Sequence, residues 1–259
     1  MTATLTPANG IKKPLLLKKS TLQDKGLKLY SYWKLSDGFI TAPADTAVHI
    51  AFVIEGYGYY GKLKVKAGDV LAFGLNIQPN HLKAHNIAMF IIDLDFTLFY
   101  SITGLRPVIC RDSVLLDSKN PFYRLGQILF PHPVKHWIPN IEAFISRTLD
   151  KQNYRLNNTM IRVSYATNEI DKERDFAAIA EDLNISYRQL QRDFLSVLGL
   201  SLKEYQSIRR FYRAAHRLKK ESLLKVAQNS GYCNQSHMNK EFKSKSGWTP
   251  KEVSKHCYY

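Results

Sequence analysis

The chain has 259 residues, a formal net charge of +15 at pH 7 and a hydrophobic content of 45%, so it can hold two domains that each bury a core. Its three scattered cysteines form neither a disulfide framework nor a zinc pattern, which argues against a secreted disulfide scaffold and favours a reduced, intracellular setting. The N-terminus lacks the apolar core of a signal peptide and residues 15–17 are too few to span a membrane, so we expect a soluble, cytoplasmic protein.

Residues 27–99 have the period-two pattern of β-strands. Residues 62–66 alternate strictly between polar and apolar side chains, and residues 48–54 and 88–99 are rich in branched and aromatic side chains. Glycines separate these runs, and residues 67–69 predict a turn. Short strands this close in sequence predict an antiparallel β-rich domain, either a sandwich or a small barrel.

The pattern becomes helical after Asn120. Phe122, Leu125 and Leu129 share one helical face, and a further helix is predicted over residues 138–149. These apolar side chains could pack internally or extend to a second copy of the chain in a homodimer, and the sequence leaves both open. The polar residues 150–158 predict a linker. The chain therefore divides into a β-rich domain with C-terminal helices, residues 1–155, and an all-α domain, residues 156–259.

The all-α domain is predicted to contain seven helices. The fourth carries a continuous apolar stripe, and its roughly 19 residues would extend about 28 Å at about 1.5 Å per residue. That length is close to the roughly 34 Å between successive major-groove faces of a DNA duplex. The predicted helices cover about 159–168, 175–183, 187–197, 201–219, 223–230, 235–246 and 250–257.

Two stretches of the all-α domain have the same pattern. In residues 176–194 and again in residues 223–242, a short apolar-periodic helix is followed by a small turn and by a helix with apolar residues four apart. Counted from Arg192 to Lys240, the two stretches are about 48 residues apart. This pattern is typical of the helix-turn-helix, which places its second helix in the DNA major groove. Two in tandem, joined by one helix, predict sequence-specific DNA binding.

The positive charge is concentrated on this same region. Residues 188–259 carry 15 Lys and Arg against 5 Asp and Glu. Concentrated basic charge is typical of a protein with a polyanionic partner, because each neutralised phosphate releases counterions. Charge alone would equally describe a lysine-rich solvated surface, and its location on the helix-turn-helix pair favours DNA.

Five motifs extend the pattern: residues 185–194, 199–205, 210–214, 231–237 and 247–250. In order and spacing they resemble the AraC/XylS family of bacterial transcription regulators over about residues 156–259. The family usually has Phe where this chain has Tyr232, and an aromatic residue where it has Met238. Tyr232 with His237 and residues 241–242 are similar to a subgroup whose N-terminal domain is poorly characterised, and residues 90–100 through 115–117 are similar to that subgroup too. More typical members have a cupin-like barrel there, and residues 65–71 are similar to its turn.

The resemblance implies which residues contact bases. Arg can donate a bidentate pair to guanine and Gln can do so to adenine, so these residue types are chemically suited to the task. The alternative is that they are solvent-facing polar residues of amphipathic helices, and the tandem arrangement favours the functional interpretation. The seven base-contacting candidates are Arg188, Gln191 and Arg192 in the first recognition helix, and Gln235, Ser236, His237 and Lys240 in the second.

Other residues of the all-α domain receive structural or secondary roles. We expect Lys243, Lys245 and Arg209 to contact phosphates or to be solvated charges, since ammonium groups off the reading face position rather than specify. Cys233 is expected to be at least half-buried. The core positions predicted from spacing, which include two alanines at a close helix crossing, are Ile179, Ala180, Leu190, Phe194, Val226, Ala227, Met238 and Phe242.

The resemblance further implies that the β-rich domain senses a signal, dimerises, or does both, and that the protein activates transcription by bringing RNA polymerase to a promoter. Its aromatic side chains could line a pocket for a small-molecule effector or could be ordinary core residues. They are Tyr30, Tyr32, Trp33, Tyr57, Tyr59 and Tyr60.

Two rival functions remain: an enzyme with an accessory helical domain, and a nonspecific architectural DNA-binding protein. The sequence contains no catalytic triad, paired carboxylates, phosphate loop or metal-ligand spacing that supports an enzyme. His49, His81 and His85 lack the tight His-x-His of a cupin metal site, so we expect neither a metal nor another cofactor. The architectural protein would bind DNA with a steep salt dependence and little sequence preference.

Overall fold

Two long antiparallel strands form the centre of the N-terminal half of this computed structural model, which describes residues 6–7, 15–151 and 156–256. The strands are β5 (Val48–Tyr60) and β8 (Asn80–Leu94), which pair with each other over most of their length. On the outer edge of β8 lie β3 (Leu27–Leu35) and β4 (Gly38–Ala42), and on the outer edge of β5 lie β7 and β6. The remaining strands of this nine-stranded sheet are β1 (Thr6–Pro7), β2 (Leu16–Lys19), β6 (Leu63–Lys66), β7 (Val70–Gly74) and β9 (Val114–Leu115).

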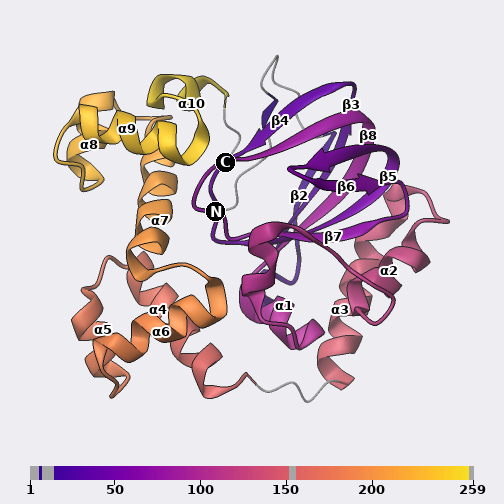
Figure 1. Ribbon diagram of the computed structural model, residues 1–259, viewed down its shortest axis with the longest axis horizontal. Helices are drawn as coiled ribbons and strands as arrows, with labels where there is room; N and C mark the ends of the chain where they lie inside the picture. Colours follow the sequence, from indigo (N-terminus) through magenta and orange to yellow (C-terminus); the bar gives the residue numbers. More distant parts are fainter. Residues whose placement is uncertain (1–5, 8–14, 152–155, 257–259) are drawn as a thin grey trace.

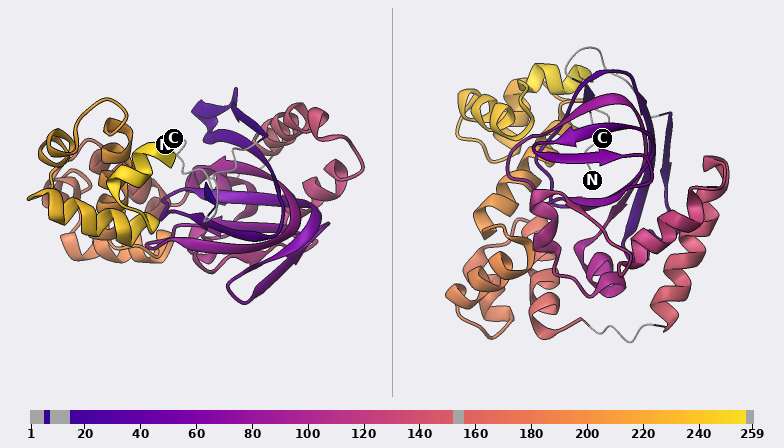
Figure 2. Two further views of the ribbon diagram at one scale, coloured as in Figure 1. Left: turned by 90° about the horizontal axis from the view of Figure 1, so that it is seen from above. Right: turned by 45° about the vertical axis from the view of Figure 1, so that its right-hand side comes forward.

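A bulge bends the long strands so that the sheet rolls up (Figure 2). The register of β5 against β8 shifts on both sides of Glu55, and the next residue, Gly56, has φ +67°. A β-carbon on Gly56 would lie 2.1 Å from the carbonyl oxygen of Asn86, so only glycine fits there. Bulges increase the twist and bend of a strand. The concave face encloses an apolar cluster that includes Trp33, Phe73 and Met89. The predicted antiparallel β-rich domain is confirmed.

Helices cover the convex face of the sheet (Figure 1). Trp137 packs edge-on against Phe52 of β5, with 5.9 Å between ring centroids. Residues 48–54 of β5 and 87–94 of β8 are covered on both faces, so these segments read as nearly continuous apolar runs. Phe122, Leu125 and Leu129 are buried in this layer, so they pack internally. The layer contains α1 (Phe96–Thr103), α2 (Pro121–Leu129) and α3 (Trp137–Lys151), with 3-10 turns η1 (Gln23–Lys25), η2 (Pro107–Asp112) and η3 (Val134–His136).

The C-terminal part is helical, as predicted. Helix α7 (Leu202–Arg217) joins two groups of helices at its opposite ends (Figure 1). Its 16 residues correspond to about 24 Å at about 1.5 Å per residue, shorter than the sequence predicted, because the helix ends at Arg217. The other helices are α4 (Asn158–Asp171), α5 (Phe176–Asp182), α6 (Tyr187–Leu198), α8 (Leu223–Asn229), α9 (Gln235–Ser246) and α10 (Pro250–His256). Across the described residues, none of the helices is both long and apolar enough to cross a membrane.

Candidate nucleic-acid interface

Helices α5 and α6 form the first helix-turn-helix, and α8 and α9 form the second. Asn184 (φ +52°) and Gly231 (φ +72°) supply the left-handed backbone of the two turns. The side chain of Ser186 then accepts a hydrogen bond from the Gln189 amide (3.1 Å) at the start of α6, and Asn234 caps α9 in the same way. Ser and Asn are favoured at this position because they satisfy an otherwise unpaired amide of the first helical turn.

The predicted core positions hold the two motifs together. Ala180 and Ala227 are each 2% exposed at the crossing between the short helix and the recognition helix. The other predicted core residues are buried as well: Ile179, Leu190, Phe194, Val226, Met238 and Phe242. One side of each recognition helix is committed to this core, so most of its polar residues lie on the other sides.

The base-contacting candidates of α6 lie on that opposite side. Arg188 and Arg192 are exposed, and Gln191 is half-buried. Arg188, Arg192 and Leu195 are spaced by four and three residues, which places them on one stripe of the helix. Leu195 is 51% exposed, an unusual state for a leucine in the middle of a helix that also contributes to a core.

The candidates of α9 lie at the other end of α7 (Figure 1). Gln235, Ser236 and Lys240 are exposed. His237 is half-buried, and its ring contacts Tyr232 edge-on, with 5.5 Å between centroids. Its Nδ1 accepts a long hydrogen bond of 3.5 Å from the amide of Cys233. His237 therefore contributes to the structure of the turn as well as to the surface.

The 48-residue spacing between the two motifs also relates two arginine–acid ion pairs that the sequence did not reveal. Arg162 of α4 pairs with Asp193 of α6 (2.6 Å), and Arg210 of α7 pairs with Glu241 of α9. Each arginine precedes its acid by 31 residues, and the second pair follows the first by 48. Both pairs lie largely out of solvent, where removal of one partner is costly. The two halves thus repeat an internal clamp that ties each recognition helix to the long helix before it.

The same register identifies further residues on the surface of the recognition helices, beside the seven base-contacting candidates. It aligns Tyr187 with Gln235, Gln191 with Asn239, and Leu195 with Lys243. Tyr187 and Lys243 are exposed, and Asn239 is half-buried. Applying the register to every position of the recognition helix, rather than to the motif residues alone, would have included them.

Three predictions about individual side chains are wrong. Lys245 is buried, its Nζ donates to the carbonyl oxygen of Ile77 (3.1 Å), and burial lowers the pKa of its ammonium group. Arg209 is not a solvated charge, since it donates two hydrogen bonds to Asp171 (2.7 and 2.8 Å). Cys233 is exposed, because it lies in the turn before the recognition helix rather than in the core.

The C-terminal ends of both recognition helices contact the β-rich domain. Arg111 of η2 donates a 2.5 Å hydrogen bond to the carbonyl oxygen of Gly199, just after α6. Near the end of α9, the carbonyl oxygen of Lys245 accepts a 2.7 Å hydrogen bond from the amide of Ala44. The Tyr212 hydroxyl of α7 donates to the Ala44 carbonyl oxygen (2.8 Å). The rolled sheet therefore contacts both helix-turn-helix motifs without covering their exposed candidates.

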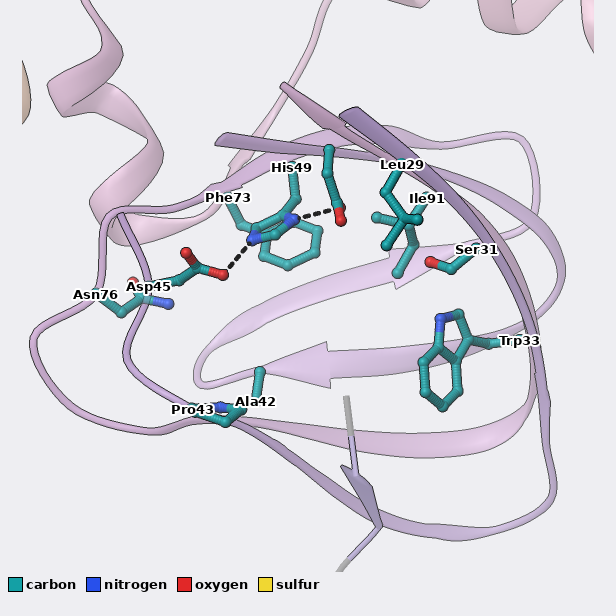
Figure 3. A pocket seen from close by; sticks show the side chains of 11 residues that line it. Leu29, Ser31, Trp33, Ala42, Pro43, Asp45, His49, Phe73, Asn76 and Ile91 are labelled. Carbon is teal, nitrogen blue, oxygen red and sulfur yellow. Dashed lines mark hydrogen bonds and ion pairs between the residues drawn. The ribbon is translucent and has the colours of Figure 1, made fainter. Parts of the chain in front are cut away.

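The loop that contains Ala44 also borders a cavity of about 20 Å³ inside the rolled sheet (Figure 3). His49 lies there between Asp45 (3.1 Å) and Asp93 (2.7 Å). Burial lowers the pKa of His49, but Asp93 and Asp45 outweigh burial and raise it to about 10. The Nε1 of Trp33 also borders the cavity and has no hydrogen-bond partner among the described residues.

The other candidate histidines and aromatics do not converge on this cavity. Tyr30 is buried, and its hydroxyl donates to Glu142 (2.9 Å). Tyr57 stacks on His85 at 4.6 Å beside an open surface hollow, which His81 also lines. Within residues 6–7, 15–151 and 156–256, no group of three His, Cys, Asp or Glu side chains could hold a metal ion.

Comparison with known proteins gives relatives for the helical part. A family model described as a helix-turn-helix domain matches residues 179–256. The HTH-type transcriptional activator RhaS of Escherichia coli (strain SE11) is 23% identical over 114 residues, 43% of this chain and 40% of that protein. RhaS of Enterobacter sp. (strain 638) is 25% identical over 107 residues, 40% of this chain and 37% of that protein. The chain thus spans about two fifths of the length of the curated relatives it matches.

The likeness in fold extends over nearly the whole chain. The crystal structure of ToxT from Vibrio cholerae O395 superposes with a TM-score of 0.53 at 15% identity, covering 90% of this chain and 98% of ToxT. ToxT from strain SCE256, bound to an unsaturated fatty acid, gives a TM-score of 0.53 at 16% identity, covering 88% and 94%. The antiparallel sheet followed by two helix-turn-helix motifs is thus a fold shared with ToxT. The helical part thus contains a helix-turn-helix domain similar to that of the RhaS activators, and the chain as a whole has the fold of ToxT.

Proposed function

We propose that this protein is a transcription regulator that binds double-stranded DNA and reads two successive major-groove segments with α6 and α9. The observation that carries the proposal is the duplicated arrangement itself: exposed polar stripes on two recognition helices at opposite ends of one continuous helix. The reading residues are Arg188, Gln191 and Arg192 on the first stripe, and Gln235, Ser236, His237 and Lys240 on the second. The structure adds Leu195, whose methyl groups could contact a thymine methyl.

Base reading is favoured over nonspecific binding because the stripes carry forked and amide side chains as well as lysines. A guanidinium or an amide can form two hydrogen bonds with one base edge, whereas an ammonium acts mainly as a point charge on phosphates. A regulator is favoured over an enzyme because the relatives of the helical part are described as transcriptional activators.

The test begins with selection of bound duplexes from a random pool by the full chain, followed by titration of the selected site. Arg192→Ala and Lys240→Ala should each weaken binding, and a lost base contact should cost about 1–3 kcal/mol. Gln127→Ala, an exposed glutamine on α2, serves as a control for the substitution and should bind as the wild type does. Unchanged sequence preference in both variants would contradict the proposal.

We further propose two modules, with residues 1–155 controlling residues 156–259, in a cytoplasmic activator that brings RNA polymerase to its promoter. The descriptions of the RhaS relatives support activation. Activation is tested by measuring transcription from a set of promoters in which the selected site lies either upstream of the transcription start or over it. Activation from the upstream site supports the proposal, and repression from every position contradicts it.

For control of the protein, we propose a small-molecule effector that acts through the β-rich domain. Support comes from the loop around Ala44, which joins the β-rich domain to α7 and α9 through hydrogen bonds. The fatty acid bound to ToxT shows that a protein of this fold accommodates a small molecule.

A homodimer is also proposed, with Ile128 of α2, 58% exposed, as a contact outside the packed layer. Light scattering of the wild type and of Ile128→Glu tests the dimer.

A further inference from the structure

Arg192, a candidate reader on α6, lies at the end of a chain of hydrogen bonds that begins on α4. The Nε of Arg162 donates to Oδ2 of Asp193 at 2.6 Å. The side-chain amide of Gln189 donates to Oδ1 of the same carboxylate at 2.7 Å. The side-chain oxygen of Gln189 accepts from an Nη of Arg192 at 2.5 Å. The four side chains therefore form one continuous series from the inside of the domain to its reading face.

The chemistry of these groups allows only one orientation of the Gln189 amide. An ionised carboxylate only accepts hydrogen bonds, so the amide nitrogen of Gln189 must face Asp193. The amide oxygen then faces outward, and a guanidinium, which only donates, is a suited partner for it. Asp193 is itself held by Arg162, and its side chain is 5% exposed. A buried acid thus determines which atom Gln189 presents to Arg192.

The second helix-turn-helix has the same clamp but not the extension. Glu241 accepts hydrogen bonds from Arg210 and from the hydroxyl of Tyr232 (2.9 Å). The residue that corresponds to Arg192 is Lys240, which has no hydrogen bond or ion pair to any part of the chain that the structure describes. The network that reaches the reading residue is thus particular to α6.

We infer that Gln189 and Asp193 are positioning residues for Arg192, which they hold extended and oriented for a base edge before DNA arrives. The inference rests on the proposed reading function of α6. An arginine that is already ordered loses less side-chain entropy on binding, and its fork can meet a base in one orientation. One hydrogen bond to Gln189 leaves the other guanidinium donors of Arg192 available.

The first experiment needs no DNA. In ¹⁵N relaxation of arginine side chains in the full chain, the Nε–H of Arg192 should have a higher order parameter than that of Arg188. Gln189→Ala should lower the Arg192 value, and Gln127→Ala should leave it unchanged. An order parameter that does not respond to Gln189→Ala overturns the inference, whatever the protein does with DNA.

The second experiment is a double-mutant cycle on the selected duplex. The base pair read by Arg192 is the one at which Arg192→Ala loses discrimination between the best and the other bases. At that base pair, Gln189→Ala should lower the discrimination ratio by about 2- to 10-fold, the range expected when one long side chain is no longer pre-ordered. In the Arg192→Ala background, Gln189→Ala should change nothing further.

A conservative variant separates positioning from helix stability. Gln189→Met keeps the length and helix propensity of the side chain but removes the amide that donates to Asp193 and accepts from Arg192, so it should lower the discrimination ratio as Gln189→Ala does, whereas a purely structural role would leave the ratio unchanged. Equal effects of Gln189→Ala with and without Arg192 would mean that Gln189 contacts the base itself, and would overturn the inference.

A wild-type chain that selects no sequence would remove the proposed function, and this inference with it. A normal selection by a Gln189→Ala chain with an unchanged ratio would remove the inference alone.

Discussion

The two helix-turn-helix motifs share a scaffold but differ in what they present to DNA. Both have an arginine–acid clamp, a capped recognition helix and a left-handed glycine at its end, in one 48-residue register. The exposed stripe of α6 contains Arg188, Arg192 and Leu195, whereas the corresponding positions of α9 are Ser236, Lys240 and Lys243. We therefore expect the first motif to depend more on forked guanidinium groups, and the second more on point charges and short polar side chains.

The largest difference is expected at the glycines that end the recognition helices. Gly199 and Gly247 both have positive φ (+66° and +81°), so alanine at either should cost about 1–2 kcal/mol. A β-carbon on Gly199 would also lie 2.5 Å from Cδ of Arg111 and 2.7 Å from Val108, whereas one on Gly247 meets no described atom within 4 Å. Overpacking should raise the total for Gly199→Ala to about 2–4 kcal/mol. Urea unfolding of both variants measures the difference, and equal costs would mean that the β-rich domain does not press on the first motif.

The next difference concerns the two reading cations. Arg192→Ala should lose about 1–3 kcal/mol at one base pair and relax its specificity. Lys240→Ala should lose less discrimination at its own base pair, because an ammonium group acts as a point charge, and should lower the slope of log K against log salt by about 1. Fluorescence anisotropy at several salt concentrations, with matched and mismatched duplexes, separates the two. A loss of discrimination for Lys240→Ala as large as that for Arg192→Ala would remove the contrast between the motifs.

Leu195 should give a smaller effect that depends on one methyl group. If Leu195 contacts a thymine, replacement of that thymine by uracil should cost up to about 0.8 kcal/mol for the wild type. The Leu195→Ala variant should bind both duplexes equally well. The comparison uses the selected site with each thymine of the first half replaced in turn. A wild type that tolerates every replacement would assign Leu195 to another surface.

The smallest effect is a pH dependence confined to the second motif. The pKa of His49 is raised from 6.5 to about 10 by Asp93 and Asp45, so its charge stabilises the fold fully below pH 6.5. That contribution is lost as the pH rises through about 10. Because Asp45 adjoins Ala44, which binds the end of α9, hydrogen exchange in α9 should increase towards pH 10 more than exchange in α6. Exchange rates are compared after correction for the intrinsic dependence on pH.

His49→Gln serves as the control for this last prediction. Its α9 should exchange faster at neutral pH and should show a weaker dependence on alkaline pH. Lys245, which binds the same loop region through Ile77, acts in the opposite direction, because burial lowers its pKa and its contribution to the free energy of unfolding therefore increases as the pH rises. Identical pH profiles for α6 and α9 in the wild type would show that the cavity does not communicate with the second motif.

Much of the helical domain was predictable because its signals are local. Apolar spacing, caps and glycines located α4 to α10 within a few residues, and they placed residues such as Phe194 and Phe242 in the core. The base-contacting candidates remain a prediction, although Arg188, Arg192, Gln235, Ser236 and Lys240 are exposed as reading requires. The ion pairs of Asp193 and Glu241 were not predicted, because an acid beside a base-contacting candidate has the same spacing as any other polar residue of an amphipathic helix.

The β-rich half was less predictable because its contacts are long-range. Alternation indicated strands but not that β5 and β8 would each pair with two shorter strands along one edge, or that a bulge at Gly56 would roll the sheet. The sequence predicted no metal at His49 but did not indicate its partners, since only the fold brings Asp45 and Asp93 to its two ring nitrogens. Lys245 looked solvated for the same reason, since Ile77 lies 168 residues earlier in the chain.

By itself, the order of residues determined the helices, their caps and the duplicated motif, because each depends on hydrogen bonds and side-chain spacing within a few residues. Tertiary structure alone decided which polar groups are clamped, which are buried and which remain on the surface. Those outcomes depend on desolvation and on partners supplied by distant segments, such as Arg162 for Asp193 and Ala44 for the end of α9. Tertiary structure likewise decides that Arg192 has a hydrogen-bond partner in Gln189 whereas Lys240 has none among the described residues.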